Sequence, residues 1–124
     1  MAAGVSAGEN FIRIGIFPNV RAVTVGPGAF KVTALPGGSL GVKTWNAQAV
    51  VKVDGNGLRI AGVRYARKVR LSPVKEGRFV VVDGRSYRGA VEVVAKGDGR
   101  LTVINELDLE EYLRGVVSSE MPPS

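Results

Sequence analysis

The sequence contains neither cysteine nor histidine, and each absence removes a class of chemistry. Without cysteine, disulfides and thiolate metal ligands are impossible, and cysteine usage says nothing about the compartment. Without histidine, the commonest metal ligand and general base is missing. Nucleophilic sites of the Ser/His/Asp and Cys/His kinds are therefore excluded, and we expect neither a metal nor a cofactor.

Long hydrophobic runs are also absent, so we expect no membrane span in this chain. The first residues, MAAGVSAGENF, lack the basic and apolar regions of a secretion signal. A length of 124 residues, with 45% hydrophobic and 23% charged residues, is typical of one globular domain. We therefore interpret residues 1–124 as a single domain, and the 17 glycines and 6 prolines predict many turns.

Acidic residues are outnumbered, since 17 Lys and Arg against 11 Asp and Glu give a net charge of +6. The excess is concentrated in residues 58–78, LRIAGVRYARKVRLSPVKEGR, where Glu76 is the only acid. Such a stretch attracts polyanions, unless it is simply the solvated face of a strand. We do not expect nucleic acid as a partner, because only Tyr65 and Phe79 could stack bases there.

Alternation of apolar and polar residues predicts half-buried strands through most of the chain. The predicted strands are residues 12–16, 23–25, 29–34, 48–53, 58–62, 68–72, 78–83, 87–96 and 100–105. Turns such as DGNG, DGRS and KGDGR supply residues that tolerate positive φ. We therefore expect consecutive antiparallel hairpins within residues 11–105, forming a sheet or a small barrel. Trp45, after the loop LPGGSLGVKT, either packs on the core or stacks on a ligand.

The apolar period changes after Asn105 and predicts one amphipathic helix over about residues 109–119. Its apolar side would comprise Leu109, Tyr112, Leu113, Val116 and Val117. Asp108 followed by Glu111 fits a capping box, and Pro122 would end the helix. The predicted fold class is therefore mainly β (α+β), with one C-terminal helix.

Glu120 would lie in line with the apolar face of that helix. Partial burial and the negative end of the helix dipole both help a carboxylic acid to keep its proton, as a general acid must. A solvated glutamate at a frayed helix end is the other interpretation, and these residues alone leave both open.

Residues 87–122, YRGAVEVVAKGDGRLTVINELDLEEYLRGVVSSEMP, carry a further pattern. It consists of a Tyr-Arg-Gly turn, a strand ending in Asn105, then Leu-Glu-x-Tyr-Leu-x-Gly-Val-Val and Glu-Met-Pro. This pattern resembles the stage II sporulation protein D and LytB amidase-enhancer family (SpoIID domain). The opening FIRIGIFPNVRAVTV resembles the start of the family domain more loosely.

The resemblance implies a peptidoglycan lytic transglycosylase, which cleaves glycan between N-acetylmuramic acid and N-acetylglucosamine and leaves 1,6-anhydro ends. It implies that Glu120 is the catalytic acid/base and that Arg88 and Glu110 are candidate substrate-binding residues. The implied partners are peptidoglycan glycan strands and a cell-wall amidase. The implied location is outside the cytoplasm, in the cell wall or the forespore intermembrane space, with a role in sporulation or wall remodelling.

The family domain continues where this sequence stops, after EMPPS. We therefore expect a fragment, the N-terminal portion of a SpoIID-like domain, whose glycan groove is incomplete and which is inactive alone. The alternative is a non-catalytic wall-binding or amidase-enhancing module, with the basic residues 58–78 as its docking surface.

Overall fold

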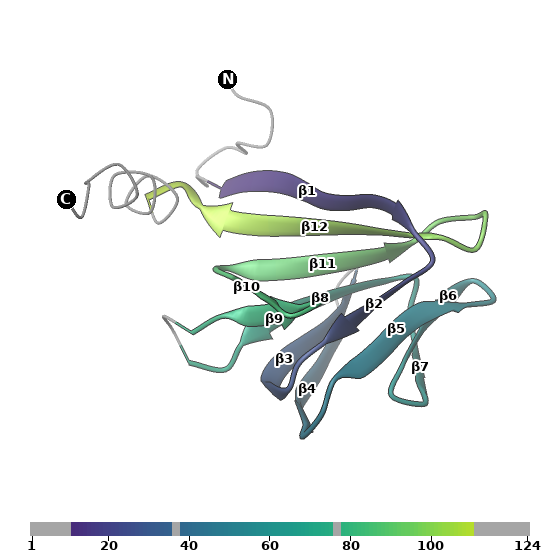
Figure 1. Ribbon diagram of the computed structural model, residues 1–124, viewed down its shortest axis with the longest axis horizontal. Coiled ribbons are helices and arrows are strands. Elements are labelled where there is room, and N and C mark those ends of the chain that lie inside the picture. The colour runs from purple at the N-terminus through teal and green to yellow at the C-terminus, as the bar shows by residue number, and fades with distance from the viewer. Residues whose placement is uncertain (1–10, 36–37, 76–77, 111–124) are drawn as a thin grey trace.

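A computed structural model of the protein describes residues 11–35, 38–75 and 78–110, which form two six-stranded antiparallel sheets (Figure 1). The strands are β1 (Phe11–Val20), β2 (Ala22–Val25), β3 (Gly28–Leu35), β4 (Gly38–Trp45), β5 (Ala49–Asp54), β6 (Gly57–Ile60), β7 (Val63–Tyr65), β8 (Lys68–Pro73), β9 (Val80–Val82), β10 (Arg85–Tyr87), β11 (Ala90–Ala95) and β12 (Leu101–Asp108). The mainly β prediction is confirmed.

The first sheet has the strand order β1-β12-β11-β8-β3-β4, and the second has the order β10-β9-β2-β5-β6-β7. The chain passes from one sheet to the other between β1 and β2 (Figure 1). The two sheets enclose a shared core of fully buried apolar side chains. The first sheet contributes Val32, Leu71 and Val93, and the second contributes Val51 and Ile60.

Residues of β12 alternate between the two faces of the first sheet. Leu101, Val103 and Leu107 are buried in the core, while residues 102, 104 and 106 are half-buried and lie on the opposite face. That opposite face is called the outer face of the first sheet below. This pattern confirms the predicted half-buried strands and leaves the outer face free to carry polar side chains.

Several strands were not predicted from the sequence. β4 covers residues that were interpreted as a loop, β7 lies within the basic stretch, and β10 lies within a predicted turn region. Trp45 ends β4 and packs against Phe30, with ring centroids 5.9 Å apart. Packing on the core is therefore the correct interpretation of Trp45.

The predicted turn DGRS is a tight hairpin between β9 and β10. Asp83 and Gly84 have φ values of 50° and 81°, as a type I′ turn requires. The expected consecutive antiparallel hairpins are present, as in β3–β4, β5–β6, β6–β7, β9–β10 and β11–β12. The sequence did not predict the long-range pairings of β1 with β12 and of β3 with β8. The described strands also leave free edges at β1, β4, β7 and β10, so they form two open sheets rather than a closed barrel.

The predicted C-terminal helix is not supported by the described residues, which contain no helical element beyond the first helical positions at Leu109 and Glu110. Residues 111–119 lie outside the described residues. The Asp108 Oδ1 atom accepts a hydrogen bond from the Glu110 N–H at 2.8 Å, which is the capping contact expected of Asp108. Within the described ranges, no helix has the length and hydropathy required to cross a membrane.

Candidate functional site

A groove of about 590 Å³ crosses the outer face of the first sheet at the end where β12 finishes. It is called the β12 groove below. Its lining includes Phe11, Lys31, Arg70, Arg88, Glu106 and Glu110. Arg88 and Glu110, predicted as substrate-binding residues from separate parts of the sequence, therefore line the same groove.

Strand register explains why charged side chains from four strands meet beside this groove. Glu106 on β12 lies opposite Arg13 on β1, and Glu92 on β11 lies opposite Arg70 on β8. Side chains of cross-strand partners point to the same face of a sheet. The outer face therefore carries alternating charges across four neighbouring strands.

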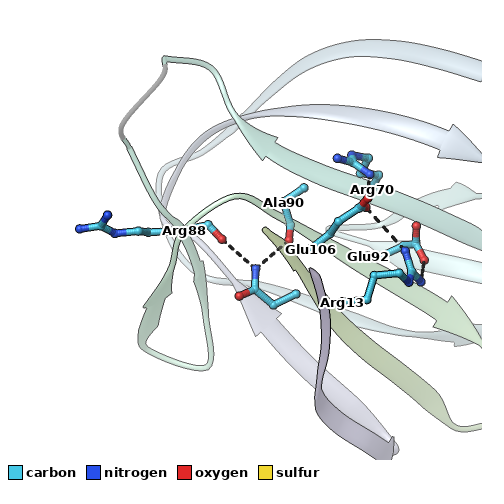
Figure 2. Close-up of polar contacts among 7 residues, drawn as sticks. Arg13, Arg70, Arg88, Ala90, Glu92 and Glu106 are labelled. Carbon is cyan, nitrogen blue, oxygen red and sulfur yellow. Dashed lines mark hydrogen bonds and ion pairs between the residues drawn. The ribbon is translucent and has the colours of Figure 1, made fainter. Parts of the chain in front are cut away.

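These four side chains form one ion-pair network (Figure 2). Arg13 donates from Nη2 to Oε1 of Glu92 at 2.7 Å, and its Nη1 lies 3.6 Å from Oε1 of Glu106. Arg70 donates to the same carboxylate of Glu106. The hydrogen bond to Glu92 raises the pKa of Arg13, so this cation stays charged. The network balances two cations against two carboxylates, and two of its members, Arg70 and Glu106, line the groove.

Arg88 is positioned by a turn that Asn105 holds against β12. The Nδ2 atom of Asn105 donates to the carbonyl oxygens of Arg88 at 2.8 Å and of Ala90 at 2.9 Å (Figure 2). Gly89 has a φ of +78°, and a Cβ at this position would lie 2.3 Å from the carbonyl oxygen of Glu106. The Tyr-Arg-Gly turn and the strand ending in Asn105 are therefore one structural unit.

The side chain of Arg88 points away from the ion-pair network (Figure 2). Its guanidinium carbon lies 5.8 Å from the centroid of the Phe79 ring, a cation–π distance. A guanidinium held in this way presents several N–H donors in a fixed plane. Arg88 can therefore donate hydrogen bonds to hydroxyl, amide or carboxylate oxygens of a ligand.

Replacing Asn105 with alanine is expected to lower the free energy of unfolding by about 2 kcal/mol, because two carbonyl oxygens lose their donor in a buried setting. Asn105 itself is only 6% exposed. Urea unfolding measures this change. Thr102→Ala is the matched control, because Thr102 also donates a hydrogen bond to a distant carbonyl, that of Pro18, but this bond is exposed to solvent. Equal losses for the two variants would contradict the argument.

Residues 97–124 match the family model of the stage II sporulation protein, SpoIID. The matched segment begins in the turn before β12 and includes all of β12. No curated protein and no solved structure matches the chain. The predicted resemblance is confirmed over this segment.

Glu106 and Glu110 of the β12 groove both fall inside the SpoIID match, and so does Glu120. Arg88 lies outside it. Glu120 lies outside the described residues, so its catalytic role stays a prediction. The structure therefore connects the groove to the SpoIID segment through β12.

Sequence reasoning missed Lys31, Arg70 and Glu106 as groove residues. They lie on three strands that are distant in sequence, and only the strand order of the first sheet brings them together. The sequence held one local signal of the ion-pair network beside the groove, which is the single carboxylate of Glu92 within the apolar run AVEVVA. A charge in such a run predicts a partner across the strand.

The basic residues 58–78 do not form one continuous face. Arg59 and Arg64 lie on β6 and β7 of the second sheet, where both interact with Asp54. Arg70 lies on the first sheet and pairs with Glu106. A docking surface made of this whole stretch is therefore not supported.

No group of three or more acidic side chains within the described ranges is arranged to hold a metal ion. The groove instead combines donors and acceptors that suit a polar organic ligand. Lys31, Arg78 and Arg88 supply cationic donors around its rim. Glu110 and Asp108 supply carboxylate acceptors at the end of β12.

Proposed function

We propose that the protein acts on the glycan strands of bacterial peptidoglycan as part of a lytic transglycosylase of the SpoIID kind, with Glu120 as the catalytic acid/base. One observation carries the proposal. The SpoIID match runs continuously from the strand that forms the floor of the β12 groove to the Glu-Met-Pro segment that contains Glu120. The proposed role includes sporulation or wall remodelling outside the cytoplasm, with a cell-wall amidase as a further partner.

A single carboxyl group is sufficient for the proposed reaction. The protonated carboxyl of Glu120 donates its proton to the glycosidic oxygen as the bond from that oxygen to C1 of the muramyl ring breaks. The C6 hydroxyl of the same ring forms a new bond to C1, and the carboxylate of Glu120 accepts the hydroxyl proton. The reaction consumes no water, because the C6 hydroxyl is the nucleophile. Glycosidases that hydrolyse the bond commonly use two carboxylates.

The β12 groove supplies the binding part of this mechanism. Arg88 donates to sugar hydroxyl or acetamide oxygens, and Glu110 accepts from sugar hydroxyls. Such contacts hold the reacting ring in position, and positioning accounts for a large part of the barrier reduction in reactions of this kind. The balanced network of Arg13, Glu92, Glu106 and Arg70 joins β1, β8, β11 and β12, and Arg88 and Glu110 lie just before β11 and just after β12.

Muropeptide analysis by liquid chromatography and mass spectrometry tests the proposal. Peptidoglycan is incubated with this chain and, in parallel, with a version extended by the second half of a SpoIID domain. We expect 1,6-anhydro-muramyl products from the extended protein and their loss in Glu120→Gln. Asp98→Asn is the matched control, because Asp98 is an exposed carboxylate in the turn before β12 and should leave the yield unchanged.

An unchanged yield from Glu120→Gln would remove Glu120 from its role. If neither protein gives products but both bind purified peptidoglycan, the non-catalytic wall-binding or amidase-enhancing module becomes the better account. Circular dichroism of each variant shows whether a loss of product reflects chemistry rather than unfolding.

A further inference from the structure

A second cavity, of about 460 Å³, lies on the outer face of the second sheet, beside the loop between β4 and β5. It is called the second-sheet cavity below. Val50 and Lys52 of β5 and Arg59 of β6 line it, and these exposed residues alternate with buried core residues along their strands. The cavity shares no lining residue with the β12 groove, so the two are separate sites.

Three cations form a row across the strands at this cavity. Lys52 lies directly opposite Arg59, and Arg59 lies directly opposite Arg64 on β7. Like charges at such positions share one face of the sheet and destabilise it. Asp54 pairs with Arg59 and Arg64, but Lys52 has no hydrogen bond or ion pair among the described residues. The row therefore keeps an uncompensated positive charge, which a bound anion would balance.

Arg59 is held in position for such an anion. Its Nε atom donates to Oδ2 of Asp54 at 2.8 Å, and its Nη1 atom donates to the carbonyl oxygen of Gly62 at 2.9 Å. A guanidinium has more N–H donors than these two contacts use. No acidic residue is among the described residues that line the cavity. Lys52 and Arg59 can therefore donate together to one anionic group.

The remaining lining adds neutral polar groups and an aromatic ring. The carboxamide side chains of Asn46 and Gln48 make no hydrogen bond within the described ranges, so their donors and acceptors are available to hydroxyl groups. Trp45 packs on Phe30 in the core and also lines the cavity. The C–H groups of a sugar or polyol can pack on such a ring. The complementary ligand therefore carries hydroxyl groups as well as a negative charge.

We infer that the second-sheet cavity is a binding site for a phosphorylated sugar or polyol. The phosphate oxygens accept hydrogen bonds from Lys52 and Arg59, and the hydroxyl groups bond to the carboxamides of Asn46 and Gln48. A phosphate group suits the pair of cations better than a carboxylate, because it offers three strong acceptor oxygens in a tetrahedral arrangement. This inference goes beyond the proposed function and does not depend on it.

Nucleic acid is the less suitable ligand for this cavity. Proteins that bind single strands stack successive bases on several aromatic side chains. Trp45 is the only aromatic residue among the described residues that line the cavity. A sugar or polyol phosphate needs only the one ring.

Fluorescence titration tests the inference, because Trp45 is the only tryptophan of the chain and lines the cavity. The probes are glucose 1-phosphate, glucose and inorganic phosphate at constant ionic strength. Glucose 1-phosphate is expected to bind about tenfold more tightly than either of the others, since each of those lacks one half of the contacts. Isothermal titration calorimetry repeats the titrations, so that binding without a change in fluorescence is also detected.

Three variants separate phosphate recognition from hydroxyl recognition. Lys52→Gln should weaken glucose 1-phosphate about tenfold and leave glucose unchanged. The same variant should keep or raise the urea midpoint of unfolding, because it removes a like-charge pair. Gln48→Ala should weaken glucose 1-phosphate and glucose but not inorganic phosphate. Lys75→Gln is the matched control, an exposed lysine that does not line the cavity, and should change no affinity.

Two further probes identify the source of the ligand. Tighter binding of poly(glycerol phosphate) per phosphate than of glucose 1-phosphate would indicate a unit of a phosphate polymer, and weaker binding would indicate a free sugar phosphate. Tighter binding of a thymidine oligonucleotide per phosphate than of both would overturn the inference in favour of nucleic acid.

Equal affinity of the wild-type chain for glucose 1-phosphate and inorganic phosphate would overturn the inference, and so would the absence of binding. Equal losses in Lys52→Gln and Lys75→Gln would show only a general effect of net charge and would also overturn it. The outcome is independent of glycan cleavage, because the cavity shares no residue with the β12 groove and binding is measured without turnover.

Discussion

Gly89→Ala is expected to destabilise the protein by roughly 3 to 5 kcal/mol, because it combines a strained backbone with a steric clash. The φ of Gly89 is +78°, and this left-handed backbone conformation is energetically unfavourable for an L residue with a Cβ. The added Cβ would also lie 2.3 Å from the carbonyl oxygen of Glu106 and 3.2 Å from the Cα of Leu107. Both contacts are backbone atoms of β12, so no side-chain rotation relieves them.

Two other glycines separate these contributions. Gly84 has a φ of +81°, and a Cβ added there would meet nothing within 4 Å, so Gly84→Ala reports backbone strain alone. A Cβ on Gly57 would lie 2.3 Å from the carbonyl oxygen of Tyr65 without a positive φ, so Gly57→Ala reports the clash alone. Urea unfolding should give the largest loss for Gly89→Ala. If Gly89→Ala loses no more unfolding free energy than Gly84→Ala, then β12 moves away from the added Cβ at little cost in stability.

Arg13→Ala is expected to cost about 2 to 3 kcal/mol, because it leaves a buried carboxylate without its partner. The side chain of Glu92 is only 5% exposed, and Arg13 is its charged hydrogen-bond partner. Glu106 keeps Arg70 when Arg13 is removed, so the uncompensated charge belongs to Glu92. The expected loss is below that of a fully buried pair because the side chain of Arg13 is 38% exposed and water can partly replace it.

The control for Arg13→Ala is Arg59→Ala, which breaks an ion pair with Asp54 on the surface of the second sheet. Exposed pairs contribute below about 1 kcal/mol, so this variant should unfold almost like the wild type. The double variant Arg13→Leu with Glu92→Leu should recover most of the stability, because apolar pairs replace buried ion pairs without a desolvation cost. Similar losses for Arg13→Ala and Arg59→Ala would contradict the assignment of Glu92 as the buried charge.

The fold was predictable where local chemistry decides it. Alternation identified β12, and Asp-Gly identified the turn between β9 and β10. β4 was not predicted as a strand, because its glycines and its neighbour Pro36 are typical of a loop. Its pairing with β3 stabilises it as a strand. The order of the strands within the first sheet was not predictable, because β1 pairs with β12 through contacts between residues from opposite ends of the described chain.

The candidate site was predictable only in part for the same reason. Arg88 and Glu110 were predicted as substrate-binding residues through a resemblance, and both line the β12 groove. Lys31 and Arg70 belong to strands that pair only in the finished sheet, so no local pattern connects them to Arg88. The sequence showed Phe79 only as one of two aromatics in or beside the basic stretch, and its contact with Arg88 depends on the folded chain.

The pairing of β1 with β12 has a consequence for synthesis on the ribosome. Phe11 pairs with Asp108, and β12 is the sole neighbour of β1 among the described strands of the first sheet. A nascent chain therefore carries β1 with an unsatisfied backbone edge until β12 has left the exit tunnel. Unpaired edges of this kind promote aggregation, and long-range pairing slows folding. The sheet that forms the β12 groove thus becomes complete only after translation has passed Asp108.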